Sequence, residues 1–99
     1  VTLKIQSEKV PLLPDVVELI EQKMWTRGDR NNRIYVGETV RISEGVSREM
    51  QSALFDPQTA GGLLISVEES KAERLISNLD DSVIIGRVER FKEKLIEVN

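Results

Sequence analysis

The first third of the chain has two different hydrophobic patterns. Apolar and polar residues alternate over residues 1–6, which predicts a half-buried strand. The two prolines in VPLLP (Val10–Pro14) prevent regular strand pairing there. Apolar residues at helical spacing then predict a helix that begins at Pro14, a tolerated first-turn position, and ends near Lys23 or Met24. We expect Trp25 to anchor the end of this helix, partly buried, and TRGDRNNR (residues 26–33) to be a polar loop.

The rest of the chain predicts short strands and two helices. Residues 34–36 and 40–42 are each expected to be a short strand or extended segment, and Ser47 is expected to cap a helix that ends near Leu54. The nearly continuous apolar run 63–67 predicts a central strand covered on both faces. Residues 69–79 follow the template of an amphipathic helix. Residues 82–91 predict a strand with a bulge or close approach at Gly86, and residues 93–98 are expected to pair back with it.

Together these elements predict one α+β domain over residues 1–99. We expect a mixed or antiparallel sheet of about four strands, with helices mainly on one face. The strand, helix and strand between Leu63 and Ile85 would form a right-handed crossover if the two strands are parallel. Because Val1 is not Met and lies within a predicted strand, we also expect the chain to be part of a longer protein.

Composition excludes several kinds of chemistry. The chain has no Cys and no His, so a disulfide, a thiol nucleophile, an imidazole base and a Cys/His zinc site are impossible. The net charge of −3 argues against a general nucleic-acid or membrane-surface binder, and no apolar run is long enough for a membrane span. The lack of Cys fits a cytoplasmic location. No group of carboxylates has convincing metal-ligand spacing.

The segment DPQTAGG (Asp56–Gly62) is unusually specified for a loop before a predicted strand. It could be a tight connection in which Asp56 forms an Asx turn, Pro57 fixes φ, and Gly61 and Gly62 adopt conformations that other residues avoid. It could instead bind a small anion or phosphate through exposed backbone N–H groups that form a concave nest. In that case the Thr59 hydroxyl and the Gln58 amide could add donors.

The segment TRGDRNNR has two similar alternatives. Its arginines (Arg27, Arg30 and Arg33) could hold a phosphate or a carboxylate bidentately. They could equally belong to a solvated loop at the carboxyl end of the preceding helix, where cations are favoured.

The run LFDPQTAGGLLISV (Leu54–Val67) resembles a signature of the selenide, water dikinase (selenophosphate synthetase) family, Asp-Pro-Gln-Thr-Ser-Gly-Gly-Leu-Leu. Ala60 stands where that family has Ser, so a hydroxyl is missing. Further resemblances follow in order along the chain: VPLLPDVVELIEQ (10–22), RGDRNN (27–32, with Gly28 and Asn32 in register and Asp29 where Thr or Ser is usual) and IIGRV (84–88).

The resemblance implies an ATP-dependent enzyme that makes selenophosphate from selenide, ATP and water with Mg²⁺. In that family an N-terminal domain dimerises, binds ATP and carries the magnesium-binding aspartates, and a C-terminal α+β domain packs against it. This chain resembles most of the C-terminal domain, so its expected partner is its own N-terminal ATP-binding domain within a homodimeric parent. The motifs with the family's catalytic Cys and Lys are missing here. We therefore expect no catalytic residue, no metal ligand, no bound ATP or Mg²⁺ and no activity in the isolated chain.

The resemblance and the loop chemistry together give a set of candidate residues. We expect these residues to line or support a substrate or phosphate cleft between the two domains: Asp56, Gln58, Thr59, Gly61, Gly62, Arg30 and Asn32. The alternative is a free-standing, non-catalytic α+β module that binds a small ligand or a partner protein.

Overall fold

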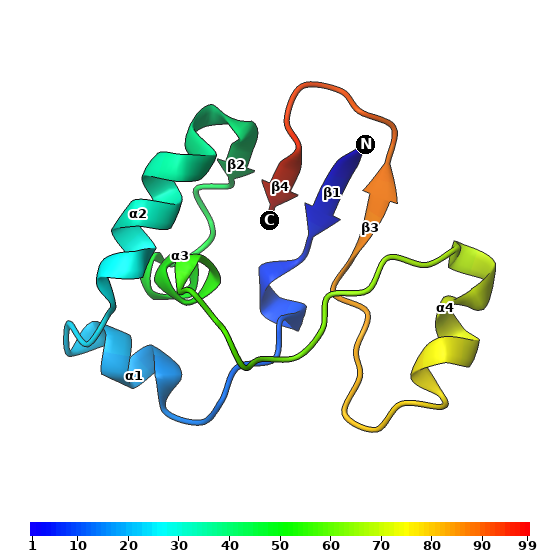
Figure 1. Cartoon of the computed structure of the whole chain (residues 1–99), viewed down its shortest axis with the longest axis horizontal. Coiled ribbons are helices and arrows are strands. Elements are labelled where there is room, and N and C mark those ends of the chain that lie inside the picture. The colour runs from blue at the N-terminus through cyan, green and yellow to red at the C-terminus, as the bar shows by residue number, and fades with distance from the viewer.

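The computed structural model describes all 99 residues, which build one four-stranded sheet with the strand order β2-β4-β1-β3 (Figure 1). Strand β1 (Thr2–Ile5) is antiparallel to β3 (Gly86–Glu89) and parallel to β4 (Ile96–Val98), and β4 is also parallel to β2 (Val40–Ile42). The predicted α+β class with a mixed four-stranded sheet is confirmed.

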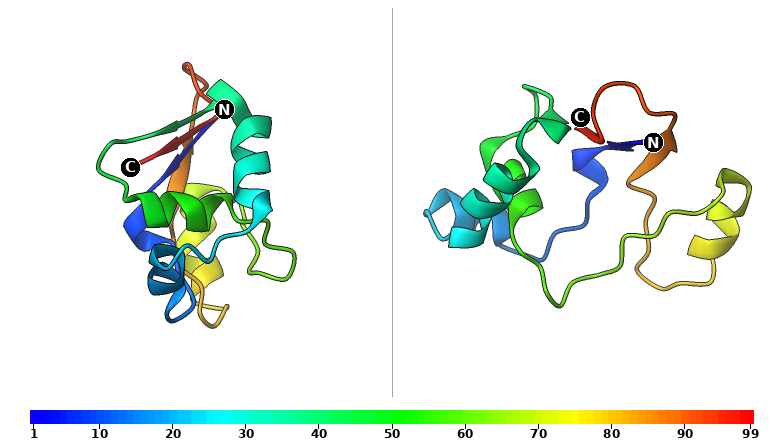
Figure 2. Two further views of the ribbon diagram at one scale, coloured as in Figure 1. Left: turned by 90° about the vertical axis from the view of Figure 1, so that its left-hand side faces the viewer. Right: turned by 45° about the horizontal axis from the view of Figure 1, so that its top comes forward.

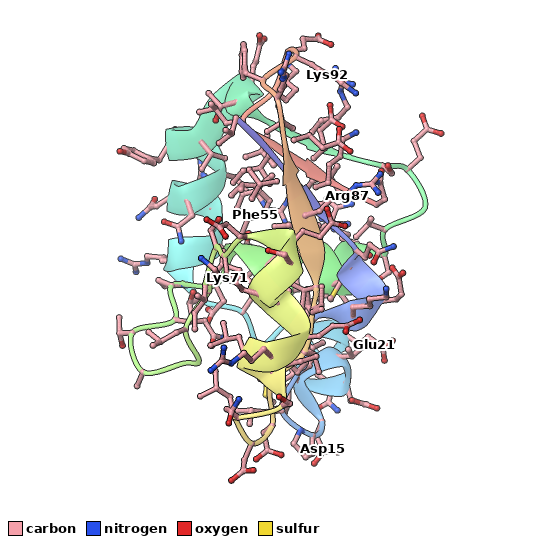
Figure 3. All side chains as sticks on the ribbon, turned by 90° about the vertical axis from the view of Figure 1, so that its right-hand side faces the viewer. Asp15, Glu21, Phe55, Lys71, Arg87 and Lys92 are labelled. Atoms are coloured by element: carbon pink, nitrogen blue, oxygen red, sulfur yellow. The ribbon has the colours of Figure 1, made fainter.

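The alternation at the start of the chain gives the sheet one apolar and one polar face. Leu3 is opposite Val88 on one side and Ile96 on the other, and Ile96 is in turn opposite Val40. One step along, Lys4 is opposite Glu97, and these side chains point to the other face. Figure 3 shows Arg87, which is opposite Lys4, on the side of the sheet away from α2.

Ion pairs join the strands across the polar face. Glu97, on the inner strand β4, is 9% exposed and pairs with Lys4 of β1 and with Arg41 of β2. The hydrogen bond and the charge of Lys4 lower the pKa of Glu97, and the nearby charge of Arg41 lowers it further. A hydrogen bond and ion pair with Glu93 raise the pKa of Arg41.

Three helices form a cluster beside the sheet. Helix α3 (Arg48–Phe55) packs against both α1 (Val16–Glu21) and α2 (Arg27–Val36). Two short 3-10 turns, η1 (Ser7–Lys9) and η2 (Gly37–Thr39), follow β1 and α2. Figure 2 shows the sheet nearly edge-on with α2 to one side, and shows α4 (Glu69–Ile76) standing apart from the cluster.

The predicted polar loop at residues 26–33 and the predicted extended segment at 34–36 are wrong, because residues 27–36 form α2. Gly28, Asn31 and Asn32 are poor helix formers, so propensity alone disfavours this helix. Asp29 in the first turn and Arg33 in the last complement the helix dipole and form an i,i+4 ion pair. Helix α1 also begins later than predicted, since Asp15 has a left-handed φ of 64° that excludes Pro14 from the helix.

The predicted central strand at residues 63–67 is wrong as well. This segment has no regular structure, and Leu63 and Leu64 are 89% and 68% exposed. The predicted crossover between Leu63 and Ile85 therefore does not form. The strand predicted at 82–91 is shorter in the structure, where only β3 forms. The last strand, β4, pairs with β1 and β2 and not with β3, because β1 lies between β3 and β4 in the sheet.

Several local predictions are confirmed. The Ser47 side chain accepts a hydrogen bond from the backbone N–H of Met50 at 3.1 Å and so caps α3. Residues 40–42 form β2, and α4 lies within the predicted helix 69–79. Gly86 makes the predicted close approach, since a Cβ atom there would collide with the backbone carbonyl of Lys4.

The molecule is more open than a compact domain of this length. Its radius of gyration is 14.3 Å, compared with about 13 Å expected for 100 residues. No helix is long and apolar enough to pass through a membrane.

Candidate functional site

The two segments singled out from the sequence meet in the structure. The Thr26 hydroxyl donates a hydrogen bond to Asp56 Oδ1 at 2.9 Å, and the Asn32 amide donates one to the Phe55 carbonyl at 2.8 Å. Between them, Gly28 lies so close to the ring of Pro57 that a Cβ atom would overlap it. The first two turns of α2 therefore hold the start of the loop Asp56–Gly62.

The end of α3 explains why the loop begins at this point. Pro57 disfavours helical geometry at Asp56, which is extended with φ −64° and ψ 134°. The last carbonyls of a helix lack intrahelical partners. Asn32 satisfies the carbonyl of Phe55, so this candidate residue acts as a cap across two helices.

A polar network fixes α2 against α3 next to these contacts. Asp29 is 8% exposed and accepts hydrogen bonds from Arg33 Nε at 2.5 Å and from Ser52 Oγ at 2.8 Å. The guanidinium of Arg33 also lies 4.4 Å from the centre of the Phe55 ring, within the range of a cation–π interaction. This network sets the position of the residue immediately before the loop.

Seven residues that make these contacts were not among the cleft candidates predicted from the sequence: Thr26, Gly28, Asp29, Arg33, Ser52, Phe55 and Pro57. The i,i+4 spacing of Asp29 and Arg33 was a usable signal for a helical ion pair. The contacts of Thr26 and Gly28 with the loop had no local signal, because their partners lie about 30 residues away.

The exposed part of the loop leaves its polar groups free. Gln58, Thr59, Gly61 and Gly62 are all exposed, and the backbone N–H groups of residues 59–67 donate no backbone hydrogen bond. The Asp56 side chain binds Thr26 instead of forming an Asx turn.

Neither Gly61 nor Gly62 has a positive φ, so the unusual backbone conformations expected at these glycines are absent. An anion nest needs neighbouring residues of right-handed and left-handed conformation, and the loop has no left-handed residue. The assignment of the loop to a cleft stays a prediction.

The Arg30 side chain forms no hydrogen bond or ion pair with the loop and lines a hollow of about 300 Å³. The hollow is lined by Trp25, Thr26, Arg27, Asp29, Arg30 and Arg33. A larger hollow of about 960 Å³ lies between α1, α2 and α3 and shares Trp25, Asp29 and Arg33 with the first. The chain brings no group of three or more acidic residues together in a geometry that could hold a metal ion.

An apolar segment follows the loop directly. Leu63, Leu64, Ile65 and Val67 are all at least 41% exposed, and Figure 1 shows this segment running from the helix cluster to α4. Such a run of exposed apolar residues is unusual on a monomer and typical of a surface that another part of a protein covers.

Comparisons with known proteins give a consistent result. The chain is 35% identical to a selenide, water dikinase of Clostridioides difficile and 35% identical to selenide, water dikinase 2 of Peptoclostridium acidaminophilum, in each case over 99% of its own length. It is 39% identical, over 87% of its length, to a selenide, water dikinase of Pelobacter propionicus.

The chain spans only 30%, 29% and 26% of these three relatives. No family model matches the chain, and no solved structure matches it. Because several relatives of one kind match almost its entire length, the chain belongs to the selenide, water dikinase family, of which it represents a segment.

Proposed function

We propose that this chain is the C-terminal domain of a larger enzyme that makes selenophosphate from selenide, ATP and water. The observation that carries the proposal is the similarity to selenide, water dikinases over 99% of the chain. The structure adds a physical role for two of the matching segments. RGDRNN supplies Gly28 and Asn32, which hold the start of DPQTAGG.

In this proposal the loop Asp56–Gly62 lines or supports a cleft between two domains. Its anchored end is fixed by α2, while Thr59, Gly61 and Gly62 extend into solvent with free donors. Those donors are available to a phosphate group or to a loop of the other domain. Arg30 and Asn32 come from the same helix, with Asn32 as a positioning residue and Arg30 as a free cation.

The partner in this proposal is the N-terminal ATP-binding domain of the same protein, within a homodimer. The exposed apolar segment 63–67 supports such a partner, because its burial would be favourable by about 25 cal/mol per Å² of apolar surface. The acidic residues of the chain form no cluster for Mg²⁺. As the family resemblance implies, we assign ATP and Mg²⁺ binding to the other domain.

The decisive experiment uses the full-length enzyme with Gly61→Val. Gly61 is exposed and has no left-handed φ, so valine should leave the fold intact while it crowds the loop. We expect the selenide-dependent formation of AMP from ATP to be lost. The control is Gly45→Val, since Gly45 is exposed, lies in a different turn and has no atom within 4 Å of the point where a Cβ would lie.

Normal turnover in the Gly61→Val enzyme would contradict the role of the loop. The isolated 99-residue chain is expected to show no ATPase activity, with or without selenide. The alternative of a free-standing, non-catalytic module predicts instead that the 99-residue chain binds a small ligand or a partner protein on its own.

A further inference from the structure

The hollow beside the first turns of α2 has an excess of positive charge that the protein does not use. Three of its six lining residues are arginines (Arg27, Arg30 and Arg33) and only Asp29 is acidic. Asp29 and Arg33 form a 2.5 Å ion pair and neutralise each other. Arg27 and Arg30 form no ion pair and no side-chain hydrogen bond, so the hollow keeps a net charge of about +2.

The walls of this hollow are held rigidly. Ser52 donates to Asp29 at 2.8 Å, and Phe55 lies 4.4 Å from the Arg33 guanidinium, so α3 fixes the ion pair from behind. The two free arginines therefore project from a helix whose position is already set.

The positive charge of the hollow contrasts with the negative charge of the whole chain. The chain has a net charge of −3 and a sequence pI of about 5.0, so it does not attract anions in general. Two arginines without ion pairs beside one hollow form a local exception in such a protein. Their planar donor pairs match the oxygens of phosphate and carboxylate groups.

Charge and size favour a phosphate group over a carboxylate. A phosphate monoester or inorganic phosphate carries a charge close to −2 near pH 7, which equals the unpaired charge of Arg27 and Arg30. The volume of about 300 Å³ is at the lower end of ligand-binding sites. Trp25, which is 49% exposed, offers an aromatic surface at the same place.

We propose that the hollow lined by Trp25, Arg27 and Arg30 binds a phosphate group, either as free phosphate or as part of a nucleotide whose base stacks on Trp25. Arg30 is also one of the cleft residues of the proposed function, so this inference rests in part on that proposal. Phosphate binding is measured on the 99-residue chain and enzymatic activity on the full-length protein, so the two proposals can fail separately.

The only tryptophan of the chain provides a direct probe. We suggest titrating the 99-residue chain with sodium phosphate, AMP, adenosine or sodium acetate at constant ionic strength and following Trp25 fluorescence. We expect a saturable change with phosphate and AMP, and a much weaker response to adenosine and acetate. Tighter binding of AMP than of phosphate would identify a nucleotide as the source of the group, and the reverse order would identify free phosphate.

Two matched double variants test where the phosphate binds. Arg27→Gln with Arg30→Gln should weaken binding at least tenfold, whereas Arg74→Gln with Arg90→Gln, which removes the same charge from positions without ion pairs, should change it less than twofold. Circular dichroism should show that both variants fold. The proposal is overturned if neither phosphate nor AMP gives saturation, if acetate binds equally well, or if the two double variants weaken binding equally.

Discussion

At the scale of single residues, a few contacts decide where the loop Asp56–Gly62 begins. Thr26, Gly28 and Asn32 contact three consecutive positions of the chain, residues 55–57. Two of these contacts are hydrogen bonds, and the third depends on the absence of a side chain. The contact between Gly28 and Pro57 tolerates substitution least, since a Cβ atom at residue 28 is fixed by the backbone and no change of rotamer can move it away from the Pro57 ring.

Gly28→Ala tests this close packing. Alanine is the better helix former by up to about 1 kcal/mol, but its Cβ would overlap the Pro57 ring. Overpacking of this kind costs about 1–3 kcal/mol, so it should outweigh the gain. We expect the free energy of unfolding, measured by urea denaturation, to fall by about 1 kcal/mol.

The matched control is Gly45→Ala, where a Cβ meets no atom within 4 Å. It should change the free energy of unfolding by no more than about 0.5 kcal/mol. A stabilised Gly28→Ala variant would show that Pro57 does not pack against Gly28.

Asp29→Ala tests the network next to the loop. The change removes the acceptor for Arg33 and Ser52 and leaves both donors without this partner. Because the Arg33 side chain is 35% exposed, water can satisfy part of it, and we expect a loss of about 1–2 kcal/mol in unfolding free energy. Lys71→Ala, which breaks an exposed ion pair with Glu68, should cost less than about 0.5 kcal/mol. Equal losses in the two variants would contradict a structural role for the network.

At the scale of elements, the sheet combines an apolar face with a polar face that carries its own ion pairs. Glu97 occupies the inner strand β4, where Lys4 and Arg41 reach it from both neighbouring strands. One carboxylate therefore links three of the four strands electrostatically.

Stability should depend on the charge of Glu97. Its pKa is lower in the folded chain than its unfolded value of about 4.3. The folded state therefore binds this proton less readily, so the stabilisation is complete above the unfolded pKa and is lost as the pH falls through the folded pKa. We expect the melting temperature to drop as the pH falls below about 5, and Glu97→Gln to reduce that drop. Glu8→Gln, an exposed position without an ion pair, should leave it unchanged, and the same drop in the Glu97→Gln chain would contradict this assignment.

The sequence was most informative where local signals decide the structure. Ser47 capped its helix as predicted, the alternation of residues 1–6 gave β1, and the period of residues 69–79 gave α4. The loop DPQTAGG stood out by its residues alone. These features depend on neighbours within a few positions along the chain.

The sequence was least informative where distant partners decide the structure. Helix α2 contains poor helix formers and is held by residues of α3 and by Pro57. The pairing of β4 with β1 instead of β3 depends on which edge is free, and no local pattern encodes that. The apolar run 63–67 has the composition of a buried strand, yet no strand of this chain pairs with it.

At the scale of the whole molecule, the apolar surface is unevenly covered. The helices of the cluster pack against one another, and the strands of the sheet pair with one another. In contrast, residues 63–67 and α4 extend away from the cluster and the sheet (Figure 2), and the apolar side chains of residues 63–67 are exposed. Together with a radius of gyration above that of a compact domain, this distribution supports the proposal that another domain covers part of the chain's apolar surface.

Leu63→Ser with Leu64→Ser separates folding of the chain from docking. Both side chains are more than two-thirds exposed, so the unfolding free energy of the isolated chain should change by no more than about 0.5 kcal/mol. Binding of a hydrophobic dye to the chain should fall. If the proposed docking is right, the same variant in the proposed full-length protein should have a lower melting temperature, because it would remove the apolar contact with the proposed N-terminal domain.

Leu3→Ser, on the apolar face of the sheet, provides the contrast. It should destabilise the isolated chain by about 2 kcal/mol. A similar loss from the double variant in the isolated chain would show that residues 63 and 64 are buried by the chain itself.

The strand order β2-β4-β1-β3 has a consequence for how the protein is made. Each of its three pairings joins strands that are not consecutive, and β1 pairs only with strands that begin at residue 86 or later. At a synthesis rate of about 5–20 residues per second, the first strand waits roughly 4–16 s on the ribosome before its partners exist. During that time it is an unpaired strand with one apolar face, which a chaperone or another nascent chain can bind.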